Sequence, residues 1–332
     1  MNGNEALLDW LLKGPAWVRF RTRVDLLGLN YEDPIVIQDH HEMLGDPQIK
    51  ELVVKSQGWE QVLLKRHNDA AHPLHALSFL AELGLTMHDS GIAEITNLIR
   101  SHRSAEGPYQ VLSNYPSHFG GSGQDEWLWC LCDAPLVLYI LAKFGFADDQ
   151  DVRVGIEWLA GLTRQNGWPC AATAQMGRFH GPGKKEDPCP YANLLMLKVL
   201  SNFQESAYKS AIDNGIETQL TLWEKRRKLH PYLFKMGTDF SKIKAPFIWY
   251  DILHVADVLS RFSQSHKDHR FMDMVDTILP KADINGRFTS ESIWTKWKGW
   301  EFCQKKEPSR WITLCIARIC NRIGYQQWDI NA

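Results

Sequence analysis

The sequence lacks a long apolar run, an excess of one charge and a low-complexity segment. Its apolar stretches fall short of the roughly 20 residues that a membrane-spanning helix needs, so we expect no membrane span. Lys and Arg number 37 against 39 Asp and Glu, which gives a net charge of -2. Because this balance provides no electrostatic attraction to a polyanion, we expect no nucleic-acid partner.

Cysteines are few and odd in number, seven in 332 residues. A small secreted domain held together by disulfides typically has a denser, even-numbered set. The first residues, Met-Asn-Gly-Asn-Glu-Ala, carry neither the basic region nor the long apolar segment of a signal peptide. We therefore expect reduced thiols and a cytoplasmic location.

Strand-like alternation of apolar and polar residues is also lacking, and apolar helices are indicated instead. Six apolar segments begin near a proline, and several end at a glycine, which are common signals for the start and stop of a helix. These segments cover residues 15–28, 73–84, 135–145, 190–203, about 246–262, and 308–324.

The apolar helices recur with a fixed period. Leu26, Leu85, Phe144, Phe203 and Phe262 are 59 residues apart each time, which is the signature of a repeat architecture. More polar helices are predicted between them, over residues 47–56, 90–102, 150–165, 207–228 and 269–279. Buried helices need amphipathic helices to cover them, so six such hairpins predict an all-α fold, an (α/α)6 toroid with an inner and an outer ring. We expect a single domain over residues 1–332, with the helix N-termini of the inner ring at one end.

Asp187 and Cys189 stand immediately before the fourth apolar helix, in the order Asp-Pro-Cys-Pro. Pro188 and Pro190 keep the backbone at Asp187 and Cys189 out of the helical conformation, so both side chains can point at one cation. Zinc accepts mixed sulfur, nitrogen and oxygen ligands, and a catalytic site uses three protein ligands and one open position. The pair therefore predicts a Zn²⁺ site that still needs a histidine.

Several other residues have a simpler interpretation. His72 and His75, at the start of the second apolar helix, could bind substrate or cap the helix, and capping is favoured. Cys130 and Cys132 form a Cys-x-Cys without a partner cysteine near them in the sequence, and we interpret them as buried thiols.

The residues from 177 onward resemble the beta subunits of protein prenyltransferases, within the squalene-cyclase-like alpha/alpha toroids. The resemblance is carried by Gly-Arg-Phe-His-Gly at 177–181, by the basic loop with Lys184 and Lys185, and by Asp-Pro-Cys-Pro-Tyr at 187–191. It implies that His254, on the next inner helix, is the third zinc ligand. Asp187, Cys189 and His254 would then be the catalytic metal site.

The sequence departs from that family at two positions. Gly181 stands where the family has an arginine for the diphosphate of the prenyl donor, and Trp127 stands near the place of a diphosphate-binding histidine. The donor is therefore not identified as a prenyl diphosphate. A separate alpha-type subunit, with which the family enzymes work, is not indicated by this chain.

The remaining candidate site residues would bind substrate. Lys184, Lys185 and Arg178 would bind an anionic leaving group. An aromatic lining for a hydrophobic substrate is predicted from Trp127, Trp168, Tyr191, Trp249 and Tyr250.

This set of ligands predicts a zinc-dependent transferase of the prenyltransferase-like type. A thiol that coordinates the metal loses its proton readily and stays nucleophilic, so a zinc-bound thiolate would accept an alkyl or prenyl group in a central cavity. The expected partners are a small-molecule or peptide thiol and a hydrophobic electrophile. The alternatives are a catalytically divergent toroid that binds a ligand or a protein, and a terpene-cyclase-like enzyme.

Overall fold

The computed structural model describes residues 3–177, 181 and 183–325. This part of the chain is mostly helical and contains thirteen α-helices. Its strands are β1 (Val111–Ser113) and β2 (Glu126–Leu128), a short antiparallel pair in which Leu112 faces Trp127. The predicted all-α class is confirmed. None of the described helices is both long and apolar enough to cross a membrane.

The chain divides into two compact units, and each is described by itself. Unit 1 consists of Met1–Glu51 and Thr238–Ala332, and unit 2 of Leu52–Gly237. Helix α4 (Pro47–Gln57) contains the boundary between them. The toroid and the single domain stay predictions.

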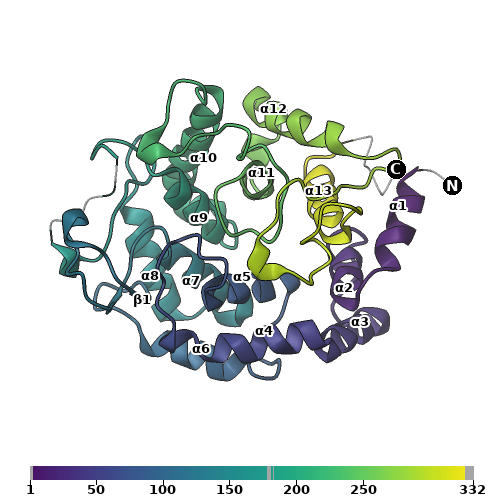
Figure 1. Cartoon of the computed structure of the whole chain (residues 1–332), viewed down its shortest axis with the longest axis horizontal. Coiled ribbons are helices and arrows are strands. Elements are labelled where there is room, and N and C mark those ends of the chain that lie inside the picture. Colours follow the sequence, from purple (N-terminus) through teal and green to yellow (C-terminus); the bar gives the residue numbers. More distant parts are fainter. Residues whose placement is uncertain (1–2, 178–180, 182, 326–332) are drawn as a thin grey trace. The chain divides into compact units, whose positions relative to one another are not determined.

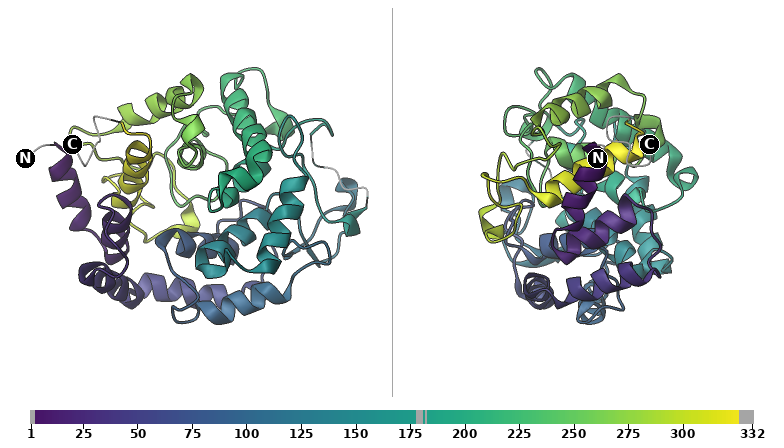
Figure 2. Two further views of the ribbon diagram at one scale, coloured as in Figure 1. Left: turned by 180° about the vertical axis from the view of Figure 1, so that it is seen from behind. Right: turned by 90° about the vertical axis from the view of Figure 1, so that its right-hand side faces the viewer.

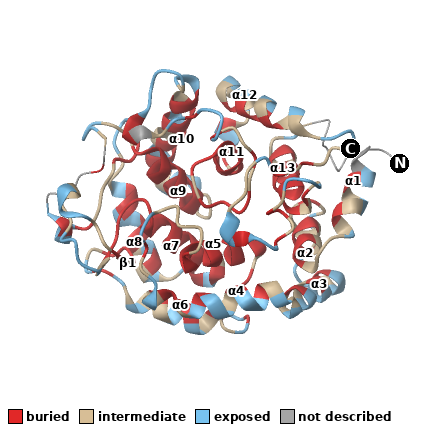
Figure 3. Cartoon of the chain, viewed as in Figure 1, coloured by how far each residue is buried: buried red, intermediate tan, exposed pale blue. Residues whose placement is uncertain are grey.

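Unit 2 is built around three apolar helices that pack in a row: α5 (Pro73–Leu83), α7 (Ala134–Leu141) and α9 (Pro190–Leu200). Every residue of these three helices is buried, as Figure 3 shows in red. The more polar helices of this unit are α6 (Ile92–Ser101), α8 (Gln150–Gly161) and α10 (Lys209–Glu224). Helices α8 and α10 both pack on α9, and α8 also contacts α7. Figure 2 shows the same run of blue to green helices from two further directions.

Unit 1 repeats this plan. Its inner helices are α2 (Ala16–Asp25), α11 (Ile252–Leu259) and α13 (Arg310–Arg322), and α13 contacts both α2 and α11 (Figure 1). The outer helices are α1 (Gly3–Leu12), α3 (Pro34–Gly45) and α12 (His269–Ile278), which pack on α13, α2 and α11, respectively. All six predicted apolar helices and all five predicted polar helices are present.

The largest difference from a predicted boundary is at the start of the fifth apolar helix. The fifth apolar helix was expected to begin at about Pro246, but α11 begins at Ile252. The side chain of Asp251 accepts a hydrogen bond from the His254 N–H at 3.0 Å, which satisfies a free donor in the first turn of the helix. The N-cap at Asp251, and not the proline, therefore fixes the start of α11.

Each inner helix carries, at a matching position of the repeat, one polar residue that pairs with a polar residue of another inner helix. These are Asp25, Glu82, Tyr139, Lys198, Asp257 and Arg318, which follow one another at intervals of 57 to 61 residues. In unit 2, Lys198 Nζ lies 2.8 Å from Glu82 Oε1, and the Tyr139 hydroxyl donates to the same oxygen at 2.8 Å. This Lys198 triad joins α9, α5 and α7.

In unit 1 the inner helices are joined by ion pairs around Asp257, which we call the Asp257 cluster. Arg318 of α13 lies 3.3 Å from Asp257 Oδ1 of α11 and 3.4 Å from Asp25 Oδ2 of α2. Arg322 and Arg261 also pair with Asp257, at 2.9 and 2.6 Å. Burial disfavours the charge on Asp257, yet the three arginines hold the pKa of its carboxyl well below the usual value.

We predict that Asp257→Asn destabilises the fold by about 3 to 5 kcal/mol, because buried arginines would lose their carboxylate partner. Urea denaturation followed by circular dichroism measures this loss. The lowered pKa means that the carboxylate stabilises the fold above the unfolded-state pKa of about 4, and that this stability is lost as the pH falls through the folded-state pKa. Asp239→Asn is the control, because the Asp239 side chain is 93% exposed and should change stability by less than about 0.5 kcal/mol. Equal stability of the two variants would contradict the prediction.

Candidate metal centre

Cys189 is held at the start of α9 by a glycine-aromatic turn. Gly167 has a φ of 89°, and an added side chain there would collide with Asn193 Oδ1 at 2.2 Å. The Asn193 side chain accepts from Trp168 N–H at 2.9 Å and donates to the carbonyls of Trp168 and Cys189. The Cys189 N–H in turn donates to the Trp168 carbonyl at 2.8 Å. The buried turn therefore fixes the backbone from which the Cys189 thiol projects.

Cys130 and Cys132 precede α7, the neighbour of α9 in the inner row. Their segment pairs with residues 171–173: Leu131 N–H donates to the Ala171 carbonyl at 2.9 Å and Thr173 N–H to the Trp129 carbonyl at 3.0 Å. Both thiols are buried, as the sequence indicated. The Cys132 Sγ and the Cys189 Sγ are 3.9 Å apart.

His67 completes this group from the loop before α5. The described residues contain a group of three whose potential ligand atoms lie within 4.8 Å of one another: His67, Cys130 and Cys132. We call these three residues together with Cys189 the Cys/His cluster. All four belong to unit 2, and only His67 is half-buried while the three thiols are buried.

Two histidines of α5 hold the loop that carries His67. The His72 ring accepts from Leu74 N–H at 3.1 Å and contacts the Val62 carbonyl at 3.0 Å, so the predicted capping role of His72 is confirmed. The His75 ring lies 3.0 Å from the His67 carbonyl. Burial lowers the pKa of His75 to about 4, so the neutral ring donates its Nε2 proton to that carbonyl. Both rings position the loop that carries His67.

Asp133 orients two members of the cluster. The His67 Nδ1 lies 2.9 Å from Asp133 Oδ1, and the Cys130 Sγ donates to Asp133 Oδ2 at 2.9 Å. Burial opposes charge on both partners, but Asp133 raises the pKa of His67 to about 10 and His67 lowers the pKa of Asp133. Nδ1 therefore donates to the carboxylate. The raised pKa keeps a proton on Nε2 at neutral pH, so a metal ion at Nε2 would have to displace that proton. A carboxylate behind a metal-binding histidine is a common arrangement, because it fixes the ring and its tautomer.

The two close thiols differ in acidity. A hydrogen bond from Cys132 lowers the pKa of Cys189, against the effect of burial, while hydrogen bonds with Cys130 and Cys189 raise the pKa of Cys132 well above its usual value. Cys189 is thus the first of the pair to become a thiolate. A thiolate is the form in which cysteine binds metals and acts as a nucleophile.

The donor set and its spacing fit zinc. Two thiolates bound to zinc at about 2.3 Å in tetrahedral geometry have sulfurs about 3.8 Å apart, and the separation of Cys132 and Cys189 is 3.9 Å. Imidazole and thiolate are the usual ligands of zinc in proteins. The group of His67, Cys130 and Cys132 can therefore hold a metal ion, and Cys189 lies outside this group, 3.9 Å from Cys132.

The metal ligands predicted from the sequence are distributed over both units. Cys189 belongs to the Cys/His cluster. Asp187 lies in the same unit, half-buried, and its carbonyl accepts from the Tyr232 hydroxyl at 3.3 Å; its carboxylate is not part of the group of three. His254 belongs to α11 of unit 1, where it is fully buried, stacks on Phe247 at 4.9 Å and donates its Nδ1 proton to the Trp249 carbonyl at 2.9 Å. The set Asp187, Cys189 and His254 stays a prediction.

The predicted substrate-binding residues have varied surroundings. Lys184 and Lys185 are exposed, whereas Arg178 lies outside the described residues. Trp168 is fully buried and donates to the Leu159 carbonyl at 2.8 Å, and Tyr191 is buried in α9. Trp127 stacks on His102 with ring centroids 3.4 Å apart. Trp249 is half-buried and Tyr250 is buried in unit 1.

Sequence reasoning missed His67, Cys130 and Cys132 as metal ligands. The signal was present, because the repeat offset of 59 residues places Cys130 at the position equivalent to Cys189. His67 had no such signal, since it lies in a loop that only the folded backbone brings to the two thiols.

No protein-family model matches the sequence, and no curated protein is significantly similar to it.

We predict that Asp133→Asn weakens zinc binding by about 10- to 100-fold, because His67 would lose the carboxylate that fixes its ring. Competition with a chromophoric chelator measures the affinity. Asp125→Asn is the matched control, because Asp125 contacts Asn114 in an exposed loop of the same unit. Equal affinities of the two variants would show that Asp133 does not support a metal ligand.

Proposed function

We propose that the protein is a zinc-dependent transferase that attaches an alkyl or prenyl group to a substrate thiol. The observation that carries this proposal is the 3.9 Å approach of the Cys189 and Cys132 sulfurs beside His67 and Cys130. Cys189 is the cysteine that the sequence pattern indicated as a zinc ligand. Its place among further thiol and imidazole donors supports a zinc ion at this end of α9.

The residues have distinct roles in this proposal. Cys132, Cys189 and His67 would hold the ion, with Asp133 fixing the His67 ring. Cys130 donates a hydrogen bond to Asp133, and in this proposal the substrate sulfur would take its place beside the ion. When zinc is bound, it lowers the pKa of a thiol that coordinates it. The ligand set implied by the family resemblance, Asp187 with Cys189 and His254, shares Cys189 with this one.

The fold that we propose for this function is a single (α/α)6 toroid. Three observations support it: the 59-residue repeat, the row of three inner helices in each unit, and the polar residues at matching repeat positions that pair between inner helices within each unit. The seven cysteines are free, which supports a reducing, cytoplasmic environment.

A toroid of this type would receive its substrates at the N-terminal ends of the inner helices. The electrophile would be hydrophobic and would lie against aromatic side chains such as Trp127, with Lys184 and Lys185 near an anionic leaving group. The acceptor would be a small-molecule or peptide thiol.

A second candidate is a binding module with a structural zinc ion. The cluster offers four side chains, and four protein ligands fill a tetrahedral shell, as is usual in structural sites. Such a protein would contain zinc but would not turn over a thiol.

The proposal is tested by metal analysis and by a transfer assay on the same preparations. Purified protein is expected to contain about one zinc ion per chain, and Cys189→Ser and Cys132→Ser should each reduce zinc affinity at least about tenfold. Mass spectrometry of reactions with a panel of thiols and alkyl or prenyl electrophiles should detect zinc-dependent thioether products.

Cys303→Ser is the control, because Cys303 is a buried thiol of unit 1 and should leave zinc unchanged. His67→Ala and His254→Ala distinguish the two ligand sets, since only the histidine that binds the ion should lower its affinity. Zinc with no product would favour the binding module. A folded protein without zinc would refute both.

A further inference from the structure

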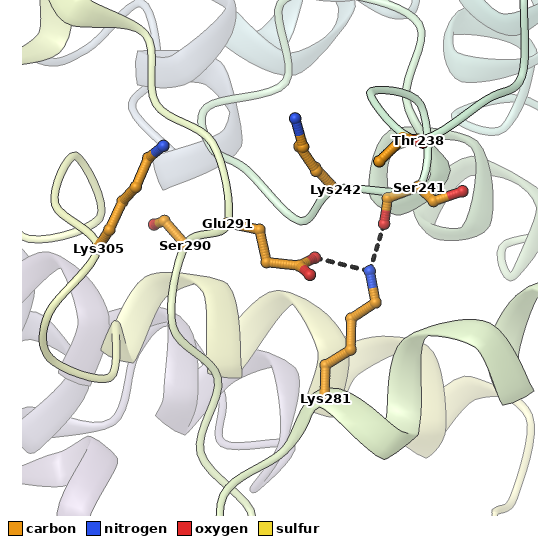
Figure 4. A pocket seen from close by; sticks show the side chains of 7 residues that line it. All are labelled: Thr238, Ser241, Lys242, Lys281, Ser290, Glu291 and Lys305. Carbon is orange, nitrogen blue, oxygen red and sulfur yellow. Dashed lines mark hydrogen bonds and ion pairs between the residues drawn. The ribbon is translucent and has the colours of Figure 1, made fainter.

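Unit 1 contains a hollow of about 470 Å³ whose lining is basic and hydroxylated (Figure 4). Lys242, Lys281 and Lys305 come to it from three separate segments: the loop before α11, the short 3-10 turn after α12 and the loop before α13. Thr238, Ser241 and Ser290 add hydroxyl groups to the lining, and Glu291 is the one acidic residue in it. The lining therefore has three positive charges against one negative charge.

The single carboxylate is already satisfied. Glu291 Oε2 lies 2.6 Å from Lys281 Nζ and accepts from Ile243 N–H at 2.8 Å. Lys281 also donates to the Ser241 carbonyl, as Figure 4 shows. Glu291 and Lys281 thus neutralise each other and stiffen one wall of the hollow.

Lys242 and Lys305 are less constrained. Lys242 pairs with Asp239 at 2.6 Å, but Asp239 is almost fully exposed, and pairs of this kind contribute little free energy. Lys305 is exposed at the rim. Two ammonium groups beside one hollow repel each other, and an anion between them relieves this repulsion.

We propose that this hollow binds the phosphate group of a small molecule, with Lys242 and Lys305 as its charged ligands and the Thr238 hydroxyl as a further donor. The Ser290 hydroxyl already donates to the Phe302 carbonyl. Lysine is a common phosphate ligand, and charge-assisted hydrogen bonds to phosphate are stronger than neutral ones. The volume lies in the range of small-molecule sites and exceeds the needs of a bare phosphate ion. The inference goes beyond the proposed transfer reaction and does not depend on the presence of zinc.

Titration calorimetry with inorganic phosphate and inorganic diphosphate, in a low-salt buffer free of other multivalent anions, tests the proposal. We expect wild-type protein to bind at least one of these probes. The double variant Lys242→Ala/Lys305→Ala should bind it at least about tenfold more weakly. Asp239→Asn should bind about two- to fivefold more tightly, because it removes the carboxylate that competes for Lys242.

Lys306→Ala is the matched control, since it removes one exposed charge next to Lys305 without altering the lining. Its affinity should stay within about twofold of wild type. Circular dichroism should show the same fold for all variants, because the exchanged side chains other than Lys242 are exposed and Lys242 is only half-buried. The proposal is overturned if wild-type protein binds neither probe, or if Lys306→Ala weakens binding as much as the double variant.

Discussion

Buried charge pairs between inner helices constrain both units of this protein. A charged side chain removed from water is tolerated only beside a partner of opposite charge, since an unpaired buried ion costs several kcal/mol. Lys198 therefore requires Glu82, and Asp257 requires Arg318, each on another helix of the same row. These requirements set the register of α5 against α9 and of α11 against α13, which apolar packing alone leaves less defined.

The metal centre depends on that register in unit 2. Helices α7 and α9 each begin a few residues from a cysteine of the cluster, so their relative position decides whether the Cys132 and Cys189 sulfurs meet. Smaller interactions then aim the side chains: the Asn193 amide holds the backbone of Cys189, and Asp133 orients His67. This arrangement determines which metal fits the site. Thiolates and an imidazole are ligands that suit zinc, whereas sites made only of oxygen ligands suit magnesium or calcium.

The helices were predictable because each depends on local signals. Proline and glycine positions and the 59-residue period predicted the six inner helices. The largest error was the start of α11, where the cap at Asp251 overrides a proline further upstream. The Cys/His cluster was predicted in part. Cys189 stood out by its position between two prolines, whereas Cys130 appeared isolated because its partners are distant in sequence. His67 depends on contacts of His72 and His75 with loop carbonyls, and no sequence pattern encodes such contacts.

The central claim is that sulfur ligands of unit 2 hold a zinc ion, and X-ray absorption at the zinc edge of the purified protein tests it most directly. The account predicts a shell of two or three sulfurs at about 2.3 Å with a nitrogen at about 2.0 Å, and the loss of one sulfur in Cys132→Ser. A shell with one sulfur that is unchanged in Cys132→Ser would instead support the set Asp187, Cys189 and His254. A shell of oxygen and nitrogen alone, or protein without zinc, would contradict the account.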